Sequence, residues 1–248
     1  MQDNISLERY EFKYLLPNNI ASKIENEIKN FMTLDNFAAA NSNNKYFVNS
    51  IYFEDNFNTG FNEKIDGYRI RKKYRFRTYQ NEFDSKKSKI FLEIKGRNLE
   101  RTYKKRVSIP LEKFDFFKSE KHYYKLLKLF PNNKIIKNFI FDSLRKNLKP
   151  IIKIDYYRRP YIISNGLYFR LTFDTNLSSS KINKLNFLDK NEVNKLCKAG
   201  QTILELKFER NIPAWFHRII QSYNLRRMSI SKYVLGMCYS NLGYETSE

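Results

Sequence analysis

The sequence predicts an α+β fold in which antiparallel strands with one charged face pack against helices. Several short segments alternate charged with apolar residues, and others repeat apolar residues at helical spacing. The chain has 248 residues, of which 42% are hydrophobic and 16% aromatic, so it can bury a core and is not a disordered basic tail. Its formal net charge of +20 predicts a polyanionic partner: nucleic acid, an anionic membrane surface or phosphates.

The clearest strand prediction covers residues 69–79. The odd-numbered positions of this segment are basic: Arg69, Arg71, Lys73, Arg75 and Arg77. Its even-numbered positions include Ile70, Tyr74 and Phe76. Because successive side chains of a strand point to opposite faces, the cations are expected to line one face, with an apolar and aromatic stripe behind them. A helix would scatter the same cations around its circumference.

Other segments are predicted to be strands of the same kind: residues 10–15, 46–53, 90–95, 102–108, 151–158, 167–174 and 203–209. The segment 46–53 carries little charge. Three segments contain an acid and a base two positions apart: Glu11 and Lys13, Glu93 and Lys95, Glu205 and Lys207. This spacing places the acid and the base side by side on one face of a strand.

Two interpretations of this alternation stay open. The first is an antiparallel sheet with one face in water. The second is a barrel of about eight strands whose outside packs against helices and whose inside is polar. Agreement among the strands, together with the presence of helices to cover apolar faces, favours the barrel. Charges inside a barrel must be paired or bound to a ligand, so an excess of inward cations implies an anionic guest.

Four segments are predicted to be helices that bury an apolar stripe in the core: residues 17–31, 111–130, 134–148 and 213–223. Residues 177–195 are polar, and we expect a surface excursion there with one short helix. Nothing in the pattern requires a domain boundary, so residues 1–248 are predicted to form a single domain.

Several classes of protein are excluded by missing signals. The segment 1–8 has no apolar signal-peptide core, and no run of about 18 apolar residues predicts a membrane span. Cys197 and Cys238 do not form a disulfide framework or a zinc pattern, and we interpret them as reduced thiols of a cytoplasmic protein. Neither a P-loop nor a GxGxxG motif occurs, so any nucleotide chemistry must use another scaffold.

The order of several motifs points to one family. The motifs are RYEFKYLL (9–16), VNSIYFED (48–55), KIDGYRIRKKYRFRTY (64–79), FLEIKGR (91–97), KKRVSI (104–109), KPIIKIDYYRRPYI (149–162), YFRLTFD (168–174), ILELKF (203–208) and SISKYVLG (229–236). In this order and spacing the sequence resembles the polyphosphate polymerase domain of the vacuolar transporter chaperone (VTC) proteins, in its stand-alone bacterial form. That family belongs to the triphosphate tunnel metalloenzymes, also called CYTH-like enzymes.

The resemblance implies an eight-stranded antiparallel β-barrel tunnel with a polar, basic interior, covered by α-helices, in which ATP or polyphosphate lies. The residues that it places in catalysis are Arg75, Arg77, Lys95 and Lys232. The residues predicted to bind phosphate are Lys13, Arg106, Tyr156, Arg158, Arg170, Lys207 and Ser231. Family members often carry a histidine two residues after the Lys95 position, where this sequence has Arg97.

The predicted function is an ATP-dependent polyphosphate polymerase, which transfers the γ-phosphate of ATP to a growing polyphosphate chain. Arginines suit this chemistry because the guanidinium stays charged and binds phosphate oxygens bidentately. Glu205 is the predicted ligand of a Mn²⁺ or Mg²⁺ cofactor. Glu11 and Glu93 are expected to orient neighbouring lysines. The expected partners are ATP and polyphosphate; full-length eukaryotic relatives have membrane helices that this chain lacks, and whether a membrane partner exists stays open.

Two alternatives remain. One is a metal-dependent inorganic or nucleoside triphosphatase of the same fold; the hydrolase branch usually has a Glu-x-Glu-x-Lys first strand, and here Arg9 stands at the position of the first glutamate. The other is a non-catalytic module that binds a polyanion. No nucleic-acid partner is expected, because most aromatic residues alternate to the face opposite the cations, whereas stacking on bases needs them on the same face.

Overall fold

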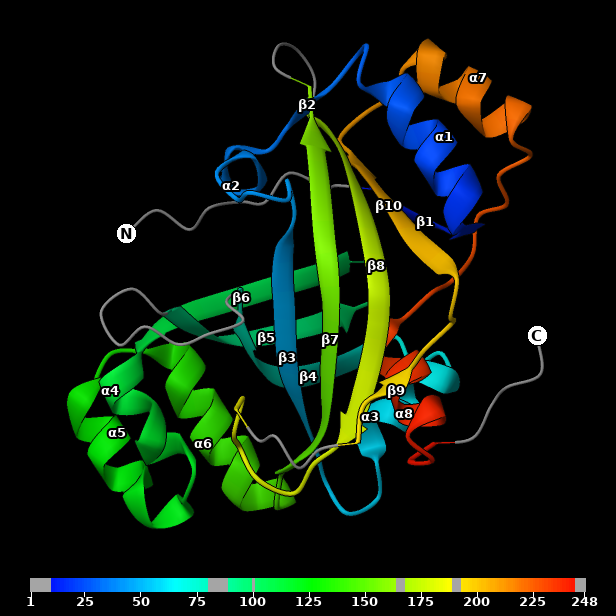
Figure 1. Ribbon diagram of the computed structural model, residues 1–248. Coiled ribbons are helices and arrows are strands. Elements are labelled where there is room, and N and C mark those ends of the chain that lie inside the picture. The colour runs from blue at the N-terminus through cyan, green and yellow to red at the C-terminus, as the bar shows by residue number, and fades with distance from the viewer. Residues whose placement is uncertain (1–9, 80–88, 100, 164–167, 189–192, 244–248) are drawn as a thin grey trace. The chain divides into compact units, whose positions relative to one another are not determined.

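The computed structural model describes residues 10–79, 89–99, 101–163, 168–188 and 193–243 (Figure 1). The chain forms two compact units, and each is assembled from separate segments of sequence. The first unit comprises Met1–Phe47, Tyr156–Leu177 and Lys198–Ser231. The second comprises Val48–Asp155, Ser178–Cys197 and Lys232–Glu248. Both units combine strands with helices, which confirms the α+β class; the single domain stays a prediction.

The first unit contains a short antiparallel sheet backed by two helices. Its elements are β1 (Tyr10–Pro17), α1 (Asn18–Ile28), β2 (Thr33–Leu34), α2 (Asn36–Ala39), β10 (Gln201–Phe208) and α7 (Ala214–Ser222), with parts of β7 (Lys149–Ile162) and β8 (Phe169–Lys181). Phe12 pairs with Leu206, which pairs with Leu171, so one face of β1, β10 and β8 is apolar. Helices α1 and α7 lie side by side (Figure 1) and pack into the same core cluster as this face.

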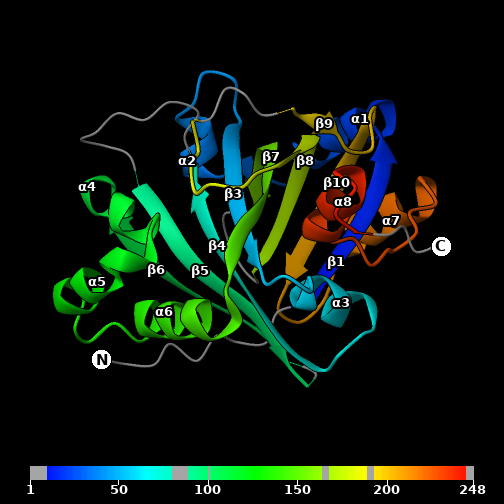
Figure 2. The ribbon, with the colours of Figure 1, turned by 90° about the horizontal axis from the view of Figure 1, so that it is seen from below.

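The second unit is larger and has its own core. Its elements are most of β3 (Tyr46–Glu54), α3 (Thr59–Ile65), β4 (Ile70–Thr78), β5 (Lys89–Asn98), β6 (Arg101–Pro110), α4 (Leu111–Phe114), the 3₁₀ turns η1 (Asp115–Phe117) and η2 (Glu120–His122), α5 (Tyr123–Leu129), α6 (Lys134–Lys146), β9 (Lys195–Leu196) and α8 (Lys232–Tyr239). Figure 2 shows α4, α5 and α6 along one side of β5 and β6. Phe139 of α6 lies at the centre of this core and contacts Phe76 at a ring distance of 5.7 Å.

Local capping signals explain where α6 begins and ends. The side chain of Asn133 accepts hydrogen bonds from the backbone N–H groups of Ile135 and Ile136, at 3.0 and 3.1 Å. These bonds satisfy donors that a helix N-terminus leaves without intrahelical partners. At the other end Asn147 adopts a left-handed conformation with φ of 52°, the usual way to stop a helix.

The strands follow the order β1-β10-β8-β7-β3-β4-β5-β6, with β2 paired to β7 and β9 paired to β8. The pairings β1–β10, β10–β8, β3–β4, β4–β5 and β5–β6 are antiparallel. An antiparallel sheet with helices is therefore confirmed. Within the residues that the structure describes, no pairing joins β1 to β6, so the predicted closed barrel is not confirmed.

Several boundaries differ from the sequence predictions. Arg69 precedes β4, which starts at Ile70. The predicted helix 111–130 is broken into α4, η1, η2 and α5, because Ser119 adopts an extended conformation between the two 3₁₀ turns. Arg9 lies outside the described residues.

The predicted surface excursion 177–195 is also corrected. Strand β8 continues to Lys181, and the described part of this segment contains no helix; residues 189–192 are not described. Three apolar side chains of this segment are buried in the core of the second unit: Ile182, Leu185 and Phe187. The segment is therefore packed against the second unit and is not a polar excursion. Across the described part of the chain, no helix has both the length and the apolar character that crossing a membrane requires.

Candidate functional site

One face of β4, β5 and β6 in the second unit is lined with basic side chains, and we call it the cation face. Its basic residues are Arg71, Lys73, Arg75 and Arg77 of β4, Lys95 and Arg97 of β5, and Lys104 and Arg106 of β6. Register places them together, because Lys73 pairs with Lys95 and Lys95 with Lys104. The alternate residues of the same strands, such as Phe76 and Leu92, are fully buried in the core.

Glu93 is the carboxylate that these strands place among the cations. Its Oε2 accepts from Arg75 Nε at 2.7 Å and lies 2.6 Å from Arg75 Nη2, and its Oε1 lies 2.8 Å from Lys104 Nζ. Burial alone would raise the pKa of Glu93, but the charges of Arg75, Arg77 and Lys104 lower it to about 2. Glu93 therefore stays ionised and holds Arg75 and Lys104 through ion pairs.

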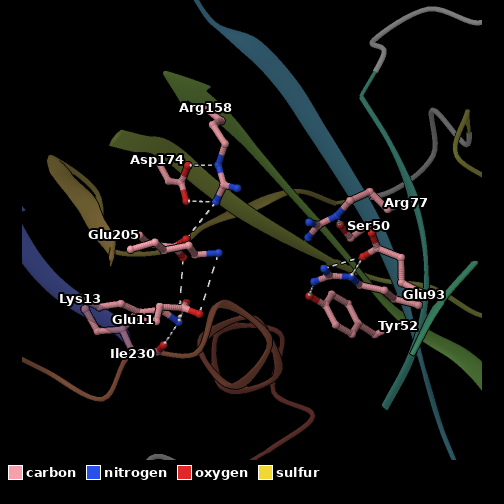
Figure 3. Close-up of polar contacts among 12 residues, drawn as sticks. Glu11, Lys13, Ser50, Tyr52, Arg77, Glu93, Arg158, Asp174, Glu205 and Ile230 are labelled. Atoms are coloured by element: carbon pink, nitrogen blue, oxygen red, sulfur yellow. Dashed lines mark hydrogen bonds and ion pairs between the residues drawn. The ribbon is translucent and has the colours of Figure 1, made fainter. Parts of the chain in front are cut away.

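Strand β3 supplies two polar residues to the cation face, Ser50 and Tyr52; Figure 3 shows Ser50 beside Arg77. Tyr52 pairs with Arg75, and its hydroxyl accepts a hydrogen bond from Arg75 Nη1 at 2.8 Å. Ser50 pairs with Arg77, and its Oγ accepts from Arg77 Nε at 2.9 Å. Arg75 and Arg77 are only 8% and 6% exposed, so these contacts fix both guanidinium groups in a largely water-excluded setting.

The remaining predicted residues of the second unit are placed as follows. Lys95 is exposed on β5, and Arg106 holds its guanidinium 4.9 Å from the ring centre of Phe91. Lys232 is the first residue of α8. This helix is fastened by the next residue, Tyr233, whose hydroxyl donates to Glu54.

Lys73 adds an ammonium group beside α8. Its Nζ lies 3.6 Å from the ring centre of Tyr233, a cation–π contact. Burial lowers the pKa of Lys73 to about 7 despite the opposing charge of Glu54. The second unit thus brings the four predicted residues Arg75, Arg77, Lys95 and Arg106 onto one face and contains Lys232 as well.

A second polar face lies on the sheet of the first unit, and we call it the mixed-charge face. Its charged residues are Glu11, Lys13, Arg158, Arg170, Asp174, Glu205 and Lys207. Lys13 is a central residue of this face (Figure 3): its Nζ lies 3.2 Å from Glu11 Oε1 and 3.9 Å from Glu205 Oε1, and it donates to the backbone carbonyl of Ile230 at 2.8 Å. Acids and bases therefore alternate across this sheet.

Arg158 is held by carboxylates on this face. Its Nε and Nη2 donate to the two oxygens of Asp174 at 2.7 and 2.6 Å, and Nη2 lies 3.2 Å from Glu205 Oε2. Burial disfavours the charged form of Arg158, but Asp174 outweighs this effect and raises the pKa of Arg158 above its usual value. The ring of Tyr156 lies 5.3 Å from the guanidinium carbon of Arg158. In this arrangement Arg158 positions the carboxylate of Glu205.

The other predicted residues of the first unit have their own contacts. Arg170 lies 3.2 Å from Asp35 Oδ2, and Lys207 Nζ lies 3.9 Å from Glu11 Oε2. Ser231 is half-buried directly after Ile230. The first unit thus contains all seven remaining predicted site residues: Lys13, Tyr156, Arg158, Arg170, Glu205, Lys207 and Ser231.

The mixed-charge face contains oxygen donors of the kind that the divalent metal implied by the resemblance would need. Within the described ranges, no three or more His, Cys, Asp or Glu side chains gather into a metal-binding group. Glu205 and Glu11 do offer hard oxygen donors, and both contact the same Lys13 amine. Mg²⁺ is usually bound by one or two carboxylates, with phosphate oxygens and waters completing its shell. These residues fit a metal whose coordination shell is completed by substrate phosphates, and they do not fit a metal bound by protein ligands alone.

Sequence reasoning missed Ser50, Tyr52 and Asp174 as members of the site. Ser50 and Tyr52 alternate with buried Ile51 and Phe53, so the strand pattern was present, but only the pairing with Arg77 and Arg75 shows which face they join. Asp174 shares a polar face of β8 with Arg170, which alternation in the sequence does predict. Its partner Arg158 lies on β7, and sequence alternation cannot predict a contact between two strands.

Comparison with known proteins places this arrangement in a family. The VTC domain model matches residues 8–241, and the chain belongs to the VTC domain family. Comparison with curated proteins found no match. Among solved structures, a putative adenylyl cyclase from Hippeastrum, HpAC1, is similar with a TM-score of 0.52 at 10% identity, over 92% of this chain and 94% of that one. A putative adenylate cyclase from Bacillus halodurans gives 0.51 at 12% identity, over 89% and 92%. These likenesses support the fold.

Proposed function

We propose that this protein is an ATP-dependent polyphosphate polymerase, which uses ATP and polyphosphate as substrates. The observation that carries the proposal is the cation face, on which Glu93 is the carboxylate of β4 to β6 and is itself held by Arg75 and Lys104. A face with this charge balance attracts a chain of phosphates. Membership of the VTC domain family supports the same substrate class.

The chemistry of the acceptor favours polymerisation over hydrolysis. A terminal phosphate of polyphosphate is already ionised at neutral pH, so it attacks the γ-phosphorus of ATP without a general base; the bond to the β,γ-bridging oxygen breaks and ADP leaves. Attack by water profits from a carboxylate base. Glu93 is unsuited to that role, because its pKa of about 2 makes it a poor proton acceptor.

The basic residues perform the catalytic work of positioning and charge neutralisation. Arg75 and Arg77 are held by Glu93, Tyr52 and Ser50, so their guanidinium groups are preorganised for the transferring phosphate. Lys95 and Arg106 add positive charge along the same face, and Lys232 adds it from α8.

Glu205 and Glu11 would hold the Mn²⁺ or Mg²⁺ cofactor together with substrate phosphates. When bound, a divalent metal neutralises phosphate oxygens as a Lewis acid. Lys13, which lies between the two carboxylates, holds them in place and contributes a point charge toward phosphate. The proposed location is the cytoplasm, which supplies ATP and suits Cys197 and Cys238, which form no disulfide.

A triphosphatase is the second candidate. The observation that favours it is the likeness in fold to HpAC1, for which a dominant triphosphatase activity is described. The carboxylates of the mixed-charge face, Glu11 and Glu205, are the groups available to assist water in that reaction.

Incubation with ATP and Mn²⁺ tests the proposal, with product length read on a polyacrylamide gel. We expect long polyphosphate chains and stoichiometric ADP. Orthophosphate as the only phosphate product would instead establish the triphosphatase. Binding of polyphosphate with no turnover of ATP would establish a non-catalytic binding module.

A further inference from the structure

Tyr52 occupies a place on the cation face that neither the motifs nor the family resemblance assigns. We propose that the Tyr52 hydroxyl is a further phosphate-binding group, which donates a hydrogen bond to a phosphate oxygen that Arg75 also binds. The inference rests on the proposed function, because it names a contact of the same site.

The position of the hydroxyl follows from how Arg75 is held. Glu93 engages the edge of the guanidinium formed by Nε and Nη2, at 2.7 and 2.6 Å. The Nη1 group at the other end donates to the Tyr52 hydroxyl at 2.8 Å. A phosphate that binds Arg75 must avoid the carboxylate of Glu93, so it approaches from the Nη1 side. The Tyr52 hydroxyl lies on that side.

The direction of the hydroxyl proton points to an anion. Arginine has donors and no acceptor, so the Tyr52 oxygen accepts from Arg75 and its own hydrogen must point elsewhere. Within the described part of the chain, the structure shows no acceptor for this hydrogen. The neighbouring Tyr233 hydroxyl donates to Glu54, and Ser50 accepts from Arg77. A donor that is 8% exposed among arginines suits a phosphate oxygen.

The setting of the ring and its charges strengthen this donor. The Tyr52 ring packs at 5.0 Å from the Tyr233 ring, which fixes the direction of the hydroxyl. Burial opposes ionisation of Tyr52, but Arg75 and Arg77 outweigh burial and lower the pKa of this phenol. A more acidic hydroxyl is a stronger hydrogen-bond donor to an anion.

The test measures tripolyphosphate binding by titration calorimetry in the intact chain, without ATP. Tyr52→Phe should weaken affinity by about 10- to 100-fold, the usual range for a hydrogen bond to a charged group. Tyr74→Phe is the matched control: Tyr74 lies on the opposite face of the sheet, where its hydroxyl bonds the carbonyl of Asn138 at 3.0 Å and Asp142 at 2.5 Å. That control should lower the unfolding midpoint and leave tripolyphosphate affinity unchanged.

A second variant distinguishes two roles of the Tyr52 hydroxyl: donating a hydrogen bond to phosphate and accepting one from Arg75. Tyr52→4-aminophenylalanine keeps an N–H donor at the same place but accepts poorly from Arg75. We expect it to recover most of the affinity that Tyr52→Phe loses. If both variants bind equally weakly, Tyr52 acts only by holding Arg75 and the inference is wrong.

The remaining outcomes separate this inference from the function on which it depends. Unchanged affinity in Tyr52→Phe overturns the inference and leaves the proposed function intact. No tripolyphosphate binding by the wild-type chain overturns the proposed function itself. If Tyr52→Phe does not fold, the 4-aminophenylalanine variant decides by itself. Tripolyphosphate affinity equal to that of the wild type supports the inference, and an affinity at least about tenfold weaker in a folded protein overturns it.

Discussion

The mixed-charge face of the first unit and the cation face of the second differ in the balance of acids and bases around their buried charges. On the mixed-charge face, Arg158 is surrounded by Asp174 and Glu205, so positive charge is neutralised by the protein itself. On the cation face, Arg75 and Lys104 both contact the carboxylate of Glu93, and Arg77 donates to the hydroxyl of Ser50. Buried charges need compensation, and under the proposed function a bound chain of phosphates would supply part of it on the cation face.

The largest effect should come from removing the arginines of the cation face. Arg75→Ala with Arg77→Ala is expected to lower kcat/KM by at least about 10³-fold, because two preorganised donors to the transferring phosphate are lost. Turnover of ATP in the presence of Mn²⁺ measures this. Lys105→Ala is the matched control, since Lys105 is an exposed cation whose pairing with Ile94 places it on the opposite face of β6. An equal loss of kcat/KM in the Lys105→Ala control would show that turnover depends on the total positive charge of the protein and not on the cation face.

Glu205→Gln should separate the roles of the two faces. We expect metal-dependent turnover to fall by about 10²-fold or more, because a neutral amide is a poor ligand for Mg²⁺ or Mn²⁺. Polyphosphate affinity measured without metal should stay near the wild-type value. Glu27→Gln, on the exposed surface of α1, serves as the control. Normal turnover in Glu205→Gln would exclude this residue as the metal ligand.

Glu93→Gln should reveal a pH-dependent contribution to stability. The pKa of Glu93 is lowered from 4.5 to about 2 in the folded chain, so its ionised form stabilises the fold above about pH 4.5, and this stabilisation is lost as the pH falls toward 2. The variant should be less stable than the wild type by about 3 kcal/mol at neutral pH. Denaturant unfolding at a series of pH values should show this difference shrinking from about pH 5 toward pH 3. A difference independent of pH would contradict the assigned ion pairs.

The smallest effect is expected from Tyr233→Phe. This change removes the hydrogen bond to Glu54 but keeps the ring contacts with Tyr52 and Lys73. Stability should fall by about 1 kcal/mol, and turnover should fall a few-fold because the first turn of α8, which carries Lys232, is held less firmly. Thermal unfolding and steady-state kinetics measure the two effects. A loss of turnover as severe as in the arginine variants would contradict this expectation and would mean that the cation face depends on α8.

Sequence reasoning could predict which side chains share a strand face, because that depends only on alternation. It placed Arg75 with Arg77 and Glu205 with Lys207 correctly. It could not predict contacts that depend on strand register between distant segments. The bond from Arg77 to Ser50 spans 27 residues and the bond from Arg158 to Glu205 spans 47, and a slip of one residue would turn either side chain to the other face.

The helices also show what sequence periodicity can predict and what it cannot. The apolar periodicity of residues 134–148 predicts α6 correctly, and Asn133 and Asn147 cap the two ends of this helix. The segment 111–130 has similar periodicity but is broken at the extended Ser119, and the apolar residues on both sides of the break, such as Phe117 and Leu126, still join one core. Tertiary packing decides this outcome, and local propensity does not reveal it.

The opposite faces of β4, β5 and β6 have a consequence for how such a protein can change over generations. The cation-face residues of β4 stand at odd positions, whereas Phe76 and its partner Leu92 are fully buried on the other side. A substitution at an exposed position such as Lys95 therefore changes the charge of this face without opening a cavity. Exposed cations such as Lys95 can therefore change independently of the core residues, whereas the buried ion pair of Glu93 with Arg75 contributes both to folding and to the charge of the face. Such a sheet is evolvable: the charge pattern of its exposed positions can change while its core sequence stays fixed.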